Sequence, residues 1–169
     1  LNEQVIEDAF LEGTWRDGRF DFTLGLVVHF GHSLISGTAE LGGEVPAYTI
    51  TDGTFAGLNL GALTGNPGLT SDLSGSVALS GRGFDPATLS AEGRIDLNRS
   101  RLNDQVIEDA FIEGTWADGR LGFTLGLDVP QGQTRLRGTA DLSGEVPTYT
   151  VTDGTFAGLN VGALTGNPD

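Results

Sequence analysis

The sequence predicts an all-β fold in which antiparallel strands follow one another as a repeated meander. Hydrophobic residues alternate with polar residues or glycine along most of the chain, which is the period of a β-strand with one apolar face. Asp-Gly pairs separate alternating segments, as in tight β-hairpins. The same order of segments also occurs twice, which indicates a tandem array.

The repetition has an offset of 101 residues. Leu1–Pro67 aligns with Leu102–Pro168 without a gap, and 49 of the 67 positions are identical. We therefore divide the chain into a partial repeat unit, residues 1–67, and a full unit of 101 residues, 68–168. The chain contains no Met and begins inside a unit, so we expect it to be a fragment of a longer repeat protein.

Two equivalent segments show the alternation best. "FDFTLGLVV" begins at Phe20 and "LGFTLGLDV" at Leu121, and every second residue in each is a large hydrophobic one. Each segment follows an Asp-Gly pair, which favours a tight turn because both central residues need positive φ. Trp15 and Trp116 precede these turns, and we expect each ring to pack over its hairpin.

The remaining segments follow the same pattern. "LSGSVALSG", "EGRIDLNRSRLN" and "TRLRGTADL" alternate as strands, and "GFDPATLSAEG" reads as a loop. "TYTVTDGTFAGLNVGAL" reads as a strand with a bulge near Asp153-Gly154, followed by a short "LNVGAL" connection. This gives about six strands in each unit and at most one helical turn.

Two architectures are compatible with these strands. Each unit could close into a β-sandwich, giving tandem sandwich units, or successive units could join edge to edge in one sheet. A row of separate domains should have a polar linker between units. Only a Gly-Asn-Pro-Gly turn and a few polar residues follow Leu63 before the next strand, which favours the continuous sheet.

Composition limits the function classes. A net charge of −14 disfavours a nucleic-acid partner, which requires a basic surface. The absence of Cys excludes disulfides and thiolate sites, and no apolar run approaches the ~20 residues of a membrane-spanning helix. We therefore expect membrane anchoring only through parts outside this chain.

No catalytic or cofactor motif is present, so we expect neither an enzyme nor a cofactor. His29 and His32 of "HFGH" are the one tempting metal pair. Their counterpart in the second copy is "PQGQ", without either His, so we predict no metal site there. The "TDGT" turns lack the spacing of a calcium loop.

The stretch "FAGLNLGALTGNPGLTSDLSGSVALSGRGFDPATLSAEGRIDLNRSRLNDQVIEDAFIEGTWADGRLGFTLGL" resembles the repeats of AsmA-like and TamB-like proteins, bacterial relatives of the bridge-like lipid-transfer proteins. The family pattern has five parts, and the resemblance covers essentially the whole chain. These parts are a Leu-Thr-Gly-x-Pro segment at Leu60–Pro67, a Gly- and Leu-rich strand at Leu73–Gly83, an Asp-Pro-x-Thr-Leu loop at Asp85–Leu89, a Ser-Arg-Leu-Asn strand at Ser100–Asn103 and an Asp-Gly hairpin at Asp118-Gly119.

The resemblance implies a β-taco, a long, curved, open antiparallel sheet with an apolar trough. It also implies a periplasmic location in the envelope of double-membraned bacteria and phospholipid acyl chains as the partner. Other segments of the same protein, or like chains, would extend the sheet. An apolar sheet face must in any case be covered by another sheet, a helix or lipid.

The alternating segments supply the candidate groove residues. Small residues on the strands, including Gly37, Ala39 and Gly138, are expected to leave room for sliding chains. The candidates for the lipid groove are Phe20, Phe22, Leu24, Leu26, Val28, Val77, Leu79, Ile95, Leu97, Leu121, Phe123, Leu125, Leu127, Val129, Leu136 and Ala140.

Three functions from different classes therefore stand. The first is a segment of an envelope-spanning lipid conduit that holds acyl chains in the groove. The second is an extracellular adhesin or stalk array of β-sandwich units, with closed cores and no lipid. The third is a structural fibre in which the open sheet packs against other chains.

Overall fold

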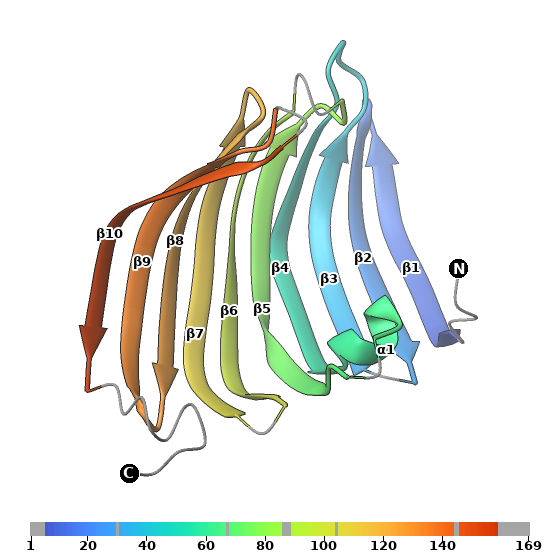
Figure 1. The fold of residues 1–169 in the computed structure, drawn as a ribbon. Helices are drawn as coiled ribbons and strands as arrows, with labels where there is room; N and C mark the ends of the chain where they lie inside the picture. The colour runs from blue at the N-terminus through green and yellow to red at the C-terminus, as the bar shows by residue number, and fades with distance from the viewer. Residues whose placement is uncertain are drawn as a thin grey trace.

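The computed structural model describes residues 6–29, 31–66, 68–85, 89–103, 105–143 and 146–158. These residues form one sheet of ten strands, and each strand lies beside its neighbours in chain order (Figure 1). All neighbouring pairs are antiparallel. The elements are β1 (Ile6–Arg16), β2 (Arg19–Val28), β3 (Gly31–Glu40), β4 (Ala47–Leu58), α1 (Leu60–Thr64), β5 (Ser71–Arg82), β6 (Ser90–Leu102), β7 (Gln105–Ala117), β8 (Arg120–Val129), β9 (Gly132–Asp141) and β10 (Thr148–Ala157).

The predicted Asp-Gly hairpins are confirmed. Asp17 and Gly18 connect β1 to β2 with φ of 49° and 81°, and Asp118 and Gly119 connect β7 to β8 with 52° and 73°. Positive φ at both central residues is the type I′ geometry that matches the twist of the flanking strands. A connection between β5 and β6 is present where the loop was predicted, but it is shorter: β5 ends at Arg82 and β6 begins at Ser90, so the last four residues of the predicted loop belong to β6.

The sheet is continuous between the two units. β4 of the first unit pairs with β5 of the second, from Ala47 opposite Arg82 to Leu58 opposite Leu73. The predicted continuous open sheet is therefore confirmed, and the described residues do not form the tandem sandwiches of the alternative. The two copies also share their register, since Leu11 faces Leu24 as Ile112 faces Leu125.

The sheet is a single layer. The chain exposes 11233 Å², whereas a compact monomer of its mass exposes about 7,900 Å². Among the described residues, the buried hydrophobic side chains are Leu73, Ile107 and Ala140. A core enclosed between two layers is therefore absent from the described part of the chain, and the apolar side chains meet one another within one face.

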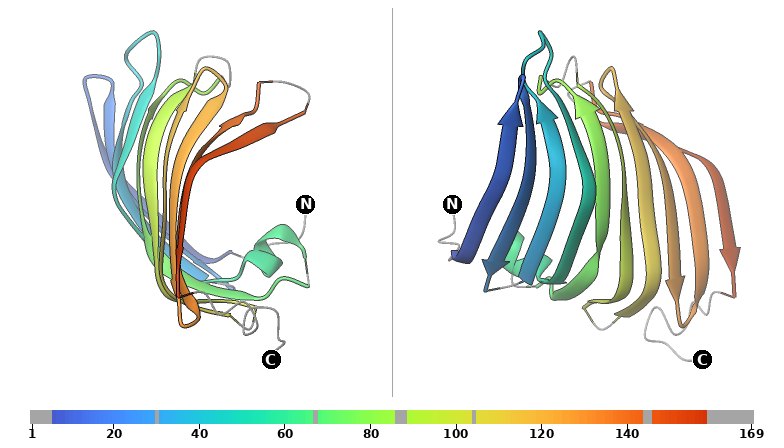
Figure 2. Two further views of the ribbon diagram at one scale, coloured as in Figure 1. Left: turned by 60° about the vertical axis from the view of Figure 1, so that its left-hand side comes forward. Right: turned by 180° about the vertical axis from the view of Figure 1, so that it is seen from behind.

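The strands bend along their length instead of running straight (Figure 2). Bulges contribute to such bending because an extra residue on one strand increases the local twist. The register shifts between Val151 and Asp153 in β10, which confirms the bulge predicted there, and the equivalent shift lies between β3 and β4.

The short helix α1 follows β4 and lies at the end of the sheet opposite the Asp-Gly hairpins (Figures 1 and 2). The side chain of Asn59 caps it by accepting from the Ala62 N–H, and Gly65 ends it in the left-handed conformation. The "LNVGAL" connection predicted for the second copy lies outside the described residues. No described helix has the length and hydropathy that a membrane-spanning helix requires.

Candidate functional site

The strand register divides the side chains between two faces of the sheet. Residues paired across successive strands lie on the same face, so a chain of partners can be followed from β1 to β10. The row nearest the Asp-Gly hairpins consists of Trp15, Phe20, Ala39, Tyr48, Gly81, Ala91, Trp116, Leu121, Ala140 and Tyr149.

Three further rows on this face also cross all ten strands. The first of them contains Phe22 and Phe123, the second contains Leu24 and Leu125, and the third contains Leu26 and Leu127. None of the residues in the four rows is charged. We call the four rows together the apolar face.

The sixteen predicted groove residues all lie on this side of the sheet, including Val28 and Val129, which extend it beyond the fourth row. Fourteen of them are partly buried. Ile95 is 40% exposed, and Ala140 is 2% exposed. Most of these side chains therefore contact their neighbours and still present surface to the outside, as expected for an open face.

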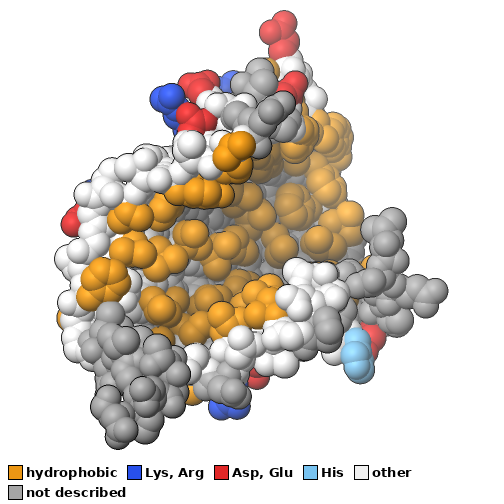
Figure 3. Space-filling model, viewed as in Figure 1, with side chains coloured by type: hydrophobic (Ala, Val, Ile, Leu, Met, Phe, Trp, Pro, Cys, Tyr) orange, Lys and Arg blue, Asp and Glu red, His pale blue; other side chains and the backbone are white. Residues whose placement is uncertain are grey.

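The space-filling view shows the shape of this face. Hydrophobic side chains gather in a hollow that extends across the sheet, and charged side chains lie at its periphery (Figure 3). The helix α1 lies on the same side of the sheet (Figures 1 and 2). The hairpin end therefore borders the hollow at one end of the strands, and α1 lies at the other end, on the part of the sheet formed by the first strands (Figure 1).

One border of the apolar face is rich in amphipathic aromatic residues. The chain has two Trp and two Tyr, and all four belong to the row nearest the hairpins. The ring centroids of Trp15 and Phe20 are 6.3 Å apart across the β1–β2 hairpin. This contact agrees with the predicted packing of Trp15 at a strand end. Trp15 and Tyr149 are exposed, and an apolar ring that carries a polar atom suits the border between an apolar phase and water. The indole N–H of Trp116, in contrast, is buried.

Small residues on the apolar face do not leave the free space that the sequence suggested. A Cβ added at Gly138 would lie 2.8 Å from Cζ of Phe123 and 2.5 Å from the carbonyl oxygen of Thr150. At Gly37 an added Cβ would meet the carbonyl oxygen of Thr49. Because rings and backbone already occupy these places, glycine here permits close packing within the sheet.

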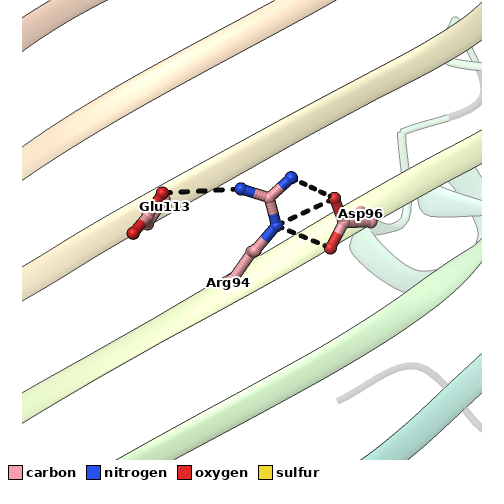
Figure 4. A network of polar contacts seen from close by, with 3 residues as sticks. All are labelled: Arg94, Asp96 and Glu113. Atoms are coloured by element: carbon pink, nitrogen blue, oxygen red, sulfur yellow. Dashed lines mark hydrogen bonds and ion pairs between the residues drawn. The ribbon is translucent and has the colours of Figure 1, made fainter.

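The opposite face carries the charges. Arg94 lies between Asp96 and Glu113 (Figure 4), with Nη2 2.6 Å from Asp96 Oδ1 and Nη1 3.4 Å from Glu113 Oε2. The hydrogen bonds to Asp96 raise the pKa of Arg94 above its usual value. The guanidinium also lies 4.3 Å from the centroid of the Phe111 ring, a cation–π contact.

An ion pair at the hairpin end occurs in both copies. Arg19 pairs with Glu40 at 3.9 Å, and the equivalent Arg120 pairs with Asp141 at 3.3 Å. The Ser143 hydroxyl donates a hydrogen bond to Asp141 and is the main cause that lowers the pKa of this carboxyl. In these exposed ion pairs, positive and negative side chains lie next to each other on the charged face, as expected for a face in contact with water.

Depressions among the described residues lie mainly on the charged face. One of them has a volume of about 530 Å³, and its lining includes five Ser and Thr side chains and the charged Glu40, Arg82 and Glu92 beside the rings of Tyr48 and Trp116. Its mixed lining, with three charged side chains, differs from the predominantly hydrophobic clefts that bind small molecules. The buried polar side chain of the described residues is Ser100, whose hydroxyl bonds both the N–H and the carbonyl of Ser74 and so ties β6 to β5.

Of the two histidines of "HFGH", His29 follows the last residue of β2 and His32 is the second residue of β3. Nδ1 of His29 is 3.4 Å from a carboxylate oxygen of Glu7. Among the described residues, no group of three or more His, Cys, Asp or Glu side chains is arranged to hold a metal ion.

Two aromatic residues on the charged face were missed by the sequence analysis. Phe10 and Phe111 are equivalent in the two copies and lie over Gly25 and Gly126, where an added Cβ would meet the rings. Neither position was assigned to a face of the sheet from the sequence. The available signal was the glycine directly opposite each ring, but it can be used only once the register is known.

Comparison with known proteins adds no assignment. No known protein family matches the chain, and neither the curated proteins nor the solved structures include a match.

Proposed function

We propose that the chain is a segment of a lipid conduit, and that its apolar face holds phospholipid acyl chains. The observation that carries the proposal is an uncharged face that continues over ten strands and across the junction of the two units. An apolar surface of this extent in water requires a covering. Acyl chains fit an open, continuous surface because their attraction is non-directional and depends on area.

The dimensions support this occupant. Ten strands about 4.8 Å apart give a face of about 43 Å along the hydrogen-bonding direction. Successive rows of the apolar face are two residues apart, so the four rows span about 20 Å along the strands. One leaflet of a bilayer core is about 15 Å thick, so an acyl chain that extends along the strands fits within the four rows. Each buried CH₂ group contributes about 0.8 kcal/mol, and successive positions along a uniform face have similar free energies. A chain can then move along the trough without crossing a charged position.

The aromatic border gives the proposed binding a direction. Trp15, Tyr48, Trp116 and Tyr149 lie along the hairpin end, whereas the rows beyond them are mostly aliphatic or glycine. Indole and phenol groups favour the level of lipid headgroups. In the proposed arrangement, the headgroups lie at the hairpin end and the acyl chains extend over the rows of Leu24 and Leu125.

The resemblance to AsmA-like and TamB-like repeats supports the same function and proposes a periplasmic location. In that setting, the chain is one stretch of a longer trough between two membranes. Nearly identical units suit this role, because a conduit needs uniform walls over its length.

The proposal is tested by native mass spectrometry of the chain after expression in bacteria and mild purification, with extraction and identification of bound lipid. The variants Leu24→Glu and Leu125→Glu place a carboxylate at equivalent positions of the apolar face. Thr124→Glu is the matched control, because Thr124 is adjacent to Leu125 on the opposite face and pairs with Arg137 on β9.

We expect phospholipid on the wild type and on Thr124→Glu. Each apolar-face variant should lose on the order of 2 kcal/mol of lipid affinity, about thirtyfold, because a carboxylate must leave water when an acyl chain covers it. Circular dichroism and urea unfolding establish that each variant is folded. A folded wild type without lipid, or equal lipid on all variants, would reject the proposal.

A further inference from the structure

The outer edge of β10 exposes side chains whose counterparts are covered elsewhere in the same sheet. Tyr149 is 70% exposed, Val151 59% and Phe156 63%. Their counterparts in β4 are Tyr48, Ile50 and Phe55, which are partly buried. The two strands have nearly the same sequence and the same pairing on their inner side, so the difference arises on the outer side.

The strand that covers β4 is β5, and the fit between them is specific. Tyr48 faces Gly81, where an added Cβ would lie 2.6 Å from Cζ of the ring, so any larger residue at this position would displace the ring from its place. The tyrosine ring also stacks on Phe84 with centroids 5.5 Å apart. The Gly83 N–H donates to the Pro46 carbonyl at 2.8 Å.

The outer edge of β10 carries nearly the same residues that β4 presents to β5. Tyr149 and Val151 occupy the places of Tyr48 and Ile50, and Pro147 occupies that of Pro46. The bulge between Val151 and Asp153 also reproduces the bulge of β4, so the outer edge has the same course. Backbone groups of an edge strand are available to a further strand with a matching side-chain pattern.

We propose that the outer edge of β10, which pairs with no other described strand, is a docking site for a strand of the β5 sequence, supplied by a further repeat unit. In the proposed register, Tyr149 lies over Gly81 of the incoming strand and Val151 faces its Leu79. In a second folded copy, β5 is already paired on both edges, with β4 and with β6, so it cannot pair with β10. The apolar face continues across this junction as it does between β4 and β5. The proposal depends on the fold alone, and it holds whether or not lipid binds.

The test uses the full chain and a synthetic peptide of residues 69–84, labelled for fluorescence anisotropy. Hydrogen exchange measured by mass spectrometry locates the bound peptide. Three changes probe the register: Gly81→Val in the peptide, Tyr149→Ala in the protein, and Ser76→Val in the peptide as the matched control. Ser76 lies on the charged face and is exposed beside β4, so an added side chain is tolerated there.

We expect the peptide to bind, with new protection confined to residues 148–157. Gly81→Val and Tyr149→Ala should each weaken binding about tenfold, because the valine fills the space that the Tyr149 ring would occupy and the alanine removes the ring. The affinity of the Ser76→Val peptide should stay within about twofold of the unmodified peptide. Absence of binding, protection elsewhere, or equal binding of a scrambled peptide would overturn the proposal. Equal affinities for the Gly81→Val and Ser76→Val peptides would overturn the register.

Discussion

Ile6 and Ile107 form a natural pair for testing how this single-layer sheet is stabilised. They are equivalent residues of the two copies, yet Ile6 is 60% exposed at the edge of the sheet and Ile107 is 7% exposed beside β6. The replacement Ile→Ala removes three carbons, worth about 2.4 kcal/mol when fully buried. Scaling by burial, Ile107→Ala should lower the free energy of unfolding by about 2.2 kcal/mol and Ile6→Ala by about 1.0 kcal/mol.

Equilibrium unfolding in urea, followed by circular dichroism, measures both losses. The predicted difference of about 1.2 kcal/mol is a lower bound, because the cavity left at Ile107 adds to its cost. Equal losses, or a larger loss for Ile6→Ala, would refute the reasoning that neighbouring strands of one sheet, and no second layer, provide the burial.

Three further changes have expected outcomes. Gly119→Ala should lower the free energy of unfolding by about 1–2 kcal/mol in urea titrations, because Gly119 has φ of 73° in the hairpin turn; an unchanged midpoint would contradict the assigned turn. Ser143→Ala should raise the pKa of Asp141 toward its ordinary value, measured by NMR titration. In the wild type, the lowered pKa of Asp141 adds to the stability of the folded state at pH values above the ordinary carboxyl pKa. This added stability is lost as the pH falls through the pKa of Asp141 in the folded state. A titration of Asp141 identical in variant and wild type would refute the assigned hydrogen bond. Arg94→Gln should cost less than about 1 kcal/mol at low salt and still less at 1 M salt, since the ion pairs with Asp96 are exposed; a large, salt-independent loss would contradict this.

The sequence was sufficient for the parts of the fold that depend on local pattern. Alternation assigned Phe123 and Leu125 to the apolar face, and Asp-Gly located the hairpin at Asp118. The short junction after Leu63 favoured a continuous sheet, and the pairing of β4 with β5 confirms it. Repetition made these inferences stronger, because each pattern occurs in both copies.

The remaining features depend on register, which alternation alone does not determine. The row that joins Trp15, Tyr48, Trp116 and Tyr149 becomes visible only when all nine strand pairs are aligned. Likewise, Gly138 was expected to leave space, but the register places Phe123 over it. Side chains from neighbouring strands fill such gaps, and their identity requires the pairing.

The most direct measurement of the central claim is photo-crosslinking of lipid to single positions of the sheet in living bacteria. Benzoyl-phenylalanine replaces Phe22 or Phe123 on the apolar face, and Thr23 or Thr124 on the charged face. The account predicts phospholipid adducts at Phe22 and Phe123 and none at the two threonine positions. Adducts at none of the four positions, or in equal amounts at all of them, would contradict a lipid-binding trough.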